Sequence, residues 1–143
     1  MGNRKTLFRK GESVITSTKD VYADAIKLLT LYCHSQAVAT GWWNDPHTGE
    51  DIHGKRNVPE LLCLCHSELS EAIEGYRKDS MDEHLPERKM FEVELADLLI
   101  RVFDIAGSMN LDLGGAFVEK MEYNLHRADH KHENRKKEGG KKF

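Results

Sequence analysis

The fold is decided by two acidic segments, HSELSEAIEGYR at residues 66–77 and EVELADLLIRVFD at residues 92–104. Apolar residues recur in both segments with the spacing of an α-helix. Each segment also carries two carboxylates three residues apart, a spacing that places both on one helix face. The four acids defined in this way are Glu68, Glu71, Glu94 and Asp97.

Four carboxylates on two packed helices predict a metal site. Like charges are not brought together in a partly buried space without a cation. A ligand set made only of oxygen favours Mg²⁺ or Mn²⁺ over zinc. If the acids share metals roughly 3.5–4 Å apart, we expect about 4 to 8 Å between their carboxylates. Glu74 lies about 120° from Glu68 around the helix and is left out.

An ordinary solvated helix face is the alternative interpretation of each acidic pair. Against it, the second segment carries Glu94, Asp97, Arg101 and Asp104 at i, i+3, i+7 and i+10. This stripe of charges adjoins the apolar stripe, so we expect it to face a neighbouring helix. We expect Asp104 to pair with Arg101 or with Lys120.

Length and patterning predict one all-α domain, an antiparallel helical bundle of about four helices. A chain of 143 residues with 39% hydrophobic content builds a thin core, which favours self-association. We divide the chain into three parts. These are an N-terminal arm (1–18), a helical domain (19–128) and a basic C-terminal tail (129–143). The helices are expected at about 19–40, 58–78, 88–108 and 113–128.

Composition also excludes several classes of partner. The net charge of −3 gives no reason to expect a nucleic acid polymer or an anionic membrane surface. No apolar run approaches the roughly 20 residues that span a bilayer. The three cysteines are an odd number and form no disulfide framework, so we expect a reducing, cytoplasmic setting.

Candidate ligand-binding residues lie outside the acidic segments. Trp42 and Trp43 open a polar loop and could stack on a nucleobase, or could cap the core instead. Asn44 and His53 could bond the edge of a base, although Asn44 suits a turn equally well. Farther along, Lys120 and Arg127 share one helix face with Asn124 between them, an arrangement suited to phosphates or to solvent.

The motifs together resemble those of a known family. Glu68-x-x-Glu71 followed by Glu94-x-x-Asp97 resembles the paired motif of the MazG-like, all-α nucleoside triphosphate pyrophosphohydrolases. That superfamily includes dCTP pyrophosphatases, dimeric dUTPases and phosphoribosyl-ATP pyrophosphohydrolases. Two further stretches are similar to members of it, His53-Gly-Lys-Arg56-Asn57 and Lys120-Met-Glu-Tyr123-Asn124-x-x-Arg127. The resemblance covers roughly residues 25 to 143.

The resemblance implies Mg²⁺-dependent hydrolysis of a nucleoside triphosphate between its α- and β-phosphates. A dNTP is the expected substrate, although the sequence leaves the base and the sugar open. It implies a homodimer or homotetramer in which more than one subunit completes each site. The four acids would hold the metal, and one of them would accept a proton from water. Arg101 stands where dCTP pyrophosphatase-like members carry a tyrosine near the substrate. The substrate-binding candidates are Trp43, Asn44, His53, Arg101, Lys120, Tyr123, Asn124 and Arg127.

Two alternatives stay open. The chain could be a non-catalytic helical oligomerisation module, in which the acids pair with the lysine-rich tail of a neighbouring chain. It could also hydrolyse phosphoribosyl-ATP or a related metabolite on the same helices. Binding of Mg²⁺ separates the first alternative from a pyrophosphohydrolase, and a panel of substrates separates the second.

Overall fold

The structure, a computed structural model, describes residues 18–139, and helices joined by loops make up that range. Within it no strand forms, only two isolated bridges in loops. None of these helices is both long and apolar enough to cross a membrane. The elements are α1 (Thr18–Ala39), α2 (Val58–Lys78), α3 (Met90–Ser108), α4 (Leu113–His126), a 3₁₀ turn (Ala128–His130) and α5 (His132–Arg135). The all-α prediction is therefore confirmed.

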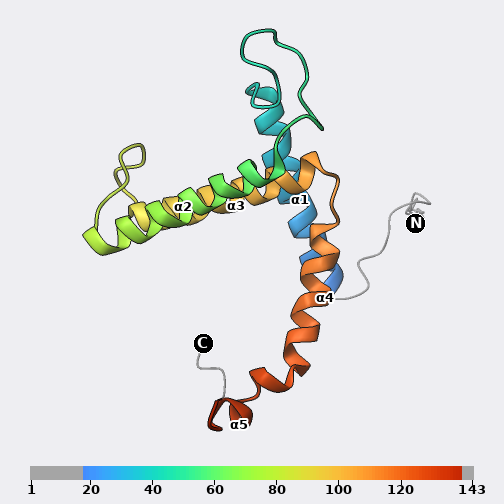
Figure 1. Cartoon of the computed structure of the whole chain (residues 1–143), viewed down its shortest axis with the longest axis vertical. Helices are drawn as coiled ribbons and strands as arrows, with labels where there is room; N and C mark the ends of the chain where they lie inside the picture. The colour runs from blue at the N-terminus through green and yellow to red at the C-terminus, as the bar shows by residue number, and fades with distance from the viewer. Residues whose placement is uncertain (1–17, 140–143) are drawn as a thin grey trace, which may run out of the picture.

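The four long helices pack in pairs along the chain. The largest contact joins α2 to α3, which run antiparallel and form an arm (Figure 1). Helix α1 crosses the inner end of that arm against α3, and α4 lies along α1. Within the described residues α4 makes no comparable contact with α2 or α3. One chain thus shows three helix pairs, whereas the sequence predicts an antiparallel bundle of about four helices.

The predicted N-terminal arm and C-terminal tail lie partly outside the described residues. Most of the predicted arm, residues 1–17, and the last residues of the predicted tail, 140–143, lie outside the described range. The described part of the tail forms the 3₁₀ turn and the short α5.

A small core lies where α1, α2, α3 and the loop after α1 meet. Its buried side chains are Trp43, Leu61, Cys65 and Ile105, with Ala37, Leu64, Leu98 and Val102 packed around them. Much of the expected apolar stripe on each helix is nevertheless exposed. On α2 the exposed members are Leu62, Leu69, Ile73 and Tyr76. Folding of one chain therefore leaves a large apolar surface uncovered.

The contact between α1 and α4 depends on a glycine. A Cβ placed on Gly114 would lie 2.5 Å from the carbonyl oxygen of Ala23. That oxygen belongs to the backbone of α1, so it has little freedom to move away. The absence of a side chain at Gly114 thus permits the close approach of α4 to α1.

We expect Gly114→Ala to lower the free energy of unfolding by about 1–3 kcal/mol, because the methyl group forces α4 away from α1. Urea denaturation followed by circular dichroism measures the change. Glu119→Ala, an exposed site on the same helix, controls for the helix propensity of alanine. A Gly114→Ala chain as stable as this control would show that the two helices separate at no cost.

Candidate functional site

Three of the four predicted acids converge between α2 and α3. Glu68 comes from the middle of α2, and Glu94 and Asp97 come from the first half of α3. Each offers a carboxylate oxygen within 4.8 Å of the others. Glu68 and Glu94 are only 5% and 7% exposed, while Asp97 is partly exposed. We call these three residues the acidic centre.

The fourth acid, Glu71, stands beside the acidic centre without joining it. Its side chain is exposed. Its negative charge still reaches the centre, where it raises the pKa of Glu94. Glu71 is therefore a neighbouring carboxylate with freedom to move.

Arg101 supplies the positive charge that the acidic centre requires. Its Nε donates a hydrogen bond of 2.5 Å to Oε1 of Glu68. The two residues belong to facing helices, so this ion pair also joins α3 to α2. An arginine with this contact explains how the carboxylate of Glu68 can be buried without a metal ion.

The remaining acids are crowded enough to hold a proton near neutral pH. Burial, a hydrogen bond with Glu68 and the charges of Glu71, Glu68 and Asp97 raise the pKa of Glu94 to about 7. Burial also raises the pKa of Asp97, helped by the charge of Glu68 and opposed by Arg101. The carboxylate oxygens of the acidic centre lie within 4.8 Å of one another, and the residues around them carry more negative than positive charge. Such a donor set fits a hard divalent cation such as Mg²⁺.

A pocket of about 420 Å³ adjoins the acidic centre. Asp97 and Arg101 form part of its wall, and α1 and the following loop form the opposite side. Its other lining groups include the rings of Tyr32 and Trp42 and the amide of Gln36. The volume lies in the range of small-molecule sites, and it suits a nucleoside.

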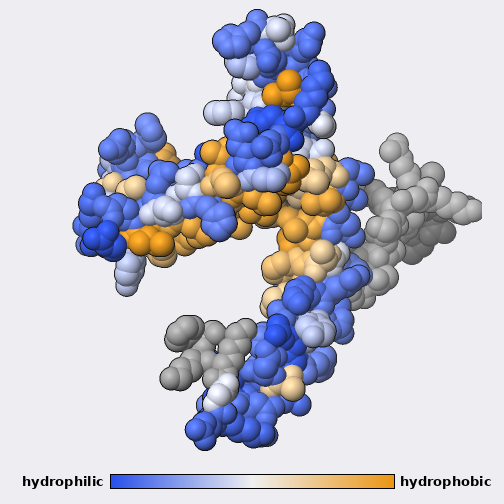
Figure 2. Space-filling view, viewed as in Figure 1, coloured by the Kyte–Doolittle hydropathy of each residue, from blue (hydrophilic) through white to orange (hydrophobic). Residues whose placement is uncertain are grey.

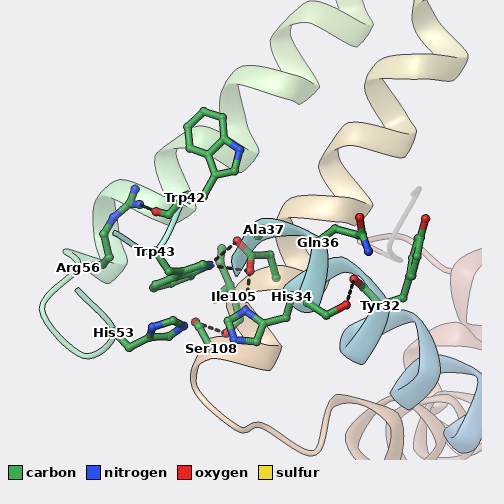
Figure 3. A network of polar contacts seen from close by, with 12 residues as sticks. Tyr32, His34, Gln36, Ala37, Trp42, Trp43, His53, Arg56, Ile105 and Ser108 are labelled. Carbon is green, nitrogen blue, oxygen red and sulfur yellow. Dashed lines mark hydrogen bonds and ion pairs between the residues drawn. The ribbon is translucent and has the colours of Figure 1, made fainter. Parts of the chain in front are cut away.

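Trp43 is part of the core in this structure. Its ring is only 3% exposed and stacks on the imidazole of His53, with 4.6 Å between ring centroids (Figure 3). Its Nε1 donates to Oδ1 of Asp104 at 2.9 Å. One face of the ring that could stack on a base is thus covered by His53. Trp42 has its ring 68% exposed in the wall of the pocket.

The two other loop candidates are engaged within the loop. Nδ1 of His53 lies 2.6 Å from Oδ1 of Asp51. Nδ2 of Asn44 donates to the carbonyl oxygen of Gly49 at 3.0 Å, so Asn44 serves the turn. Neither residue lines the pocket beside the acidic centre.

The candidates on α4 form a cluster of their own. The Lys120 ammonium lies 4.6 Å from the centroid of the Tyr123 ring, and the Arg127 guanidinium lies 5.8 Å from it. Arg127 also pairs with Asp129, and Oδ1 of Asn124 is buried without a hydrogen-bond partner. Because α4 packs on α1, the fold of one chain does not bring these residues to the acidic centre.

Asp104 is the residue of the site that sequence reasoning placed wrongly. It does not pair with Arg101 or Lys120; it accepts hydrogen bonds from Trp43 and from Nδ1 of His34. It also lines the pocket. The i+10 position in the charged stripe of α3 did indicate that it faces a neighbouring helix. Its partners lie 61 and 70 residues away in the chain, beyond the reach of a helix pattern.

No family model, curated protein or solved structure matches this chain. The likeness to MazG-like pyrophosphohydrolases accordingly stays a prediction from the motifs quoted above.

The raised pKa of Glu94 predicts how stability varies with pH. The folded chain holds a proton that the unfolded chain releases between about pH 4.5 and 7. Without divalent cations, the free energy of unfolding should therefore fall as the pH rises through this interval. Glu94→Gln should remove this fall and stabilise the chain at pH 8 by about 1–3 kcal/mol.

Urea denaturation at pH 5 and pH 8 in the presence of a chelator tests this expectation. Glu92→Gln makes the same chemical change at an exposed site two residues away. Equal pH dependence in the Glu94→Gln and Glu92→Gln chains would contradict the assignment.

Proposed function

We propose that the chain is a Mg²⁺-dependent nucleoside triphosphate pyrophosphohydrolase that cleaves a dNTP between its α- and β-phosphates. The observation that carries the proposal is the position of the acidic centre, three carboxylates within 4.8 Å, beside a pocket of nucleoside size. A nucleotide is a ligand with both matching parts, since its phosphates bind Mg²⁺ and its base requires a cavity. The motif resemblance points to the same chemistry.

Each residue of the site has a role under this proposal. Glu68, Glu94 and Asp97 would hold Mg²⁺, which supplies neutralisation of charge on the phosphate oxygens. Glu71 is exposed and outside the acidic centre, so its carboxylate is available to accept the proton of the attacking water. Arg101 keeps Glu68 in place and leaves the rest of its guanidinium in the pocket wall for a phosphate.

We propose that the working form is a homodimer or homotetramer, whose helices complete a closed bundle. The support is the apolar surface that one chain leaves exposed along the α2–α3 arm and along α4 (Figure 2). Its members include Ile73 and Tyr76 on α2, Leu99 on α3 and Phe117 and Met121 on α4. A second copy would cover this surface and could bring the cations of its α4 to the acidic centre. We place the protein in the cytoplasm, in keeping with its three free cysteines.

A non-catalytic oligomerisation module is the second candidate, and the same exposed apolar surface favours it. In that case the ion pair between Arg101 and Glu68 would be purely structural. The acidic centre would then take up no metal. The two candidates differ in their response to Mg²⁺.

We expect release of pyrophosphate from dNTPs in Mg²⁺, and a loss of about 100-fold or more in Glu68→Gln and Asp97→Asn, because each loses a metal-binding oxygen. A coupled phosphate assay over dNTPs, NTPs and phosphoribosyl-ATP measures the rate and separates the substrates. Glu92→Gln is the matched control. Undiminished turnover in both site variants would refute the proposed site.

We also expect Mg²⁺ to raise the melting temperature of the unaltered chain, since a ligand that binds only the folded state stabilises it. The rise should vanish in Asp97→Asn and persist in Glu92→Gln. Differential scanning calorimetry with and without Mg²⁺ measures it. An identical melting temperature in both conditions would favour the oligomerisation module.

If a second copy of the chain covers the apolar surface, assembly should be sensitive to substitution of the exposed Ile73 on α2. We expect Ile73→Asp, which buries a charge if the surface is covered, to shift the assembly toward monomer by at least about tenfold in the dissociation constant. Analytical ultracentrifugation measures the shift. Lys55→Asp, in the exposed loop after α1, is the control. An unchanged oligomer in the Ile73→Asp chain would place the contact elsewhere.

A further inference from the structure

We propose that Asp104 selects the base of the substrate, and that the pocket beside the acidic centre takes bases with an exocyclic amino group (cytosine, adenine or guanine) over uracil and thymine. This inference rests on the proposed function, because it assigns the pocket to the nucleoside of the same substrate. It adds a specificity residue, Asp104, to the metal-binding acids.

The carboxylate of Asp104 is held in a fixed orientation by two elements. Oδ1 lies 2.9 Å from Nε1 of Trp43 in the loop and 2.8 Å from Nδ1 of His34 on α1. Because a carboxylate only accepts, the hydrogen of the imidazole must lie on Nδ1 of His34. Figure 3 shows the Trp43 and His34 side chains converging on this point.

The second oxygen of Asp104 has room for a further donor. Within residues 18–139, Oδ2 receives only a contact of 3.3 Å from Nε1 of Trp43, and that donor lies closer to Oδ1. Since Asp104 lines the pocket and its side chain keeps 20% of its surface exposed, a ligand in the pocket can reach it. The pocket thus contains an anchored acceptor that requires an N–H group.

Several other polar groups of the pocket each use a donor within the protein. The hydroxyl of Thr40 donates to backbone carbonyls of its own helix. Arg56 donates to the carbonyl oxygen of Trp42, and Arg101 donates to Glu68. The amide of Gln36 can turn to offer either a donor or an acceptor, so it serves any base. The exposed ring of Trp42 provides stacking that is equally indifferent to the base.

The chemistry of the bases then decides the preference. Cytosine presents an amino group where uracil presents a carbonyl oxygen. The amino group would donate to Oδ2 of Asp104, whereas the carbonyl would place one acceptor against another and leave Oδ2 without this donor. A mismatch of this kind in a site built for a donor reduces binding by about tenfold or more.

Deoxycytidine and deoxyuridine form a matched pair for the test, because they share the sugar and the ring skeleton and differ only in the group at position 4 and in the hydrogen that uracil carries on N3. We measure their binding to the full chain by quenching of tryptophan fluorescence, and we measure kcat/KM for dCTP and dUTP in Mg²⁺. We expect deoxycytidine to bind at least about tenfold more tightly, with a similar ratio in kcat/KM. Binding of the nucleosides needs no hydrolysis, so it tests Asp104 even if the chain is inactive on triphosphates.

Asp104→Asn should invert the preference. The oxygen of the new amide can still accept from Trp43 and His34, which places its NH₂ group at the position of Oδ2. That group donates, so uracil becomes the better partner. Asp79→Asn, the same change at an exposed residue whose left-handed backbone suits asparagine, should leave the ratio unchanged. If Asp104 had only a structural role, Asp104→Asn would weaken the binding of both nucleosides equally.

Three results would overturn the inference. They are equal binding of the two nucleosides, tighter binding of deoxyuridine, and no binding of either at millimolar concentration. Hydrolysis of dCTP and dUTP at equal rates would refute selection by Asp104 while leaving the proposed function intact. Hydrolysis of neither, with deoxycytidine still preferred, would refute the function and keep the assignment of the pocket.

Discussion

Repulsion between carboxylates is the constraint on which the α2–α3 pair depends. Glu68, Glu94 and Asp97 are pressed together by the same packing that buries the apolar sides of these helices. The chain relieves the repulsion in two visible ways, with the guanidinium of Arg101 and with a proton retained near neutral pH on Glu94. Both are available to a chain without metal, and both leave excess negative charge. The region is therefore stable enough to fold and still prepared to bind a cation.

The charged stripe of α3 contacts different elements along its length. Its first part, Glu94 and Asp97, faces α2 and contributes to the acidic centre. Its last member, Asp104, faces α1 and the loop after it, and fastens that loop through Trp43. Arg101 lies between them and contacts α2. A single helix face thus joins the acidic centre to the Asp104 end of the adjoining pocket, which fixes the distance between the two.

The local parts of this structure follow from sequence, and the long-range parts do not. Helical periodicity and the i, i+3 spacing of the acids predict α2, α3 and a convergence of four carboxylates, of which the structure brings three together. These features depend on residues one or two turns apart. Glu71 obeys the same spacing yet stays outside, because the rotation of α2 about its own axis decides which acid reaches the centre, and spacing alone does not give that rotation. The burial of Trp43 and the partners of Asp104 depend on contacts across 61 and 70 residues. Such contacts are set by how the loop folds back, which no periodicity encodes.

The crossing of α1 over α3 has a consequence for the order in which the site is built. The α2–α3 pair consists of neighbours in the chain, so the acidic centre can form from local contacts as soon as both helices exist. The pocket beside the acidic centre can form only after α3 has been made and has packed against α1. The Ala23–Gly114 contact forms later still, because it also requires α4. During synthesis, α1 emerges before α2, α3 and α4 but acquires its last neighbour only when α4 is complete, and its apolar side is unprotected during that interval.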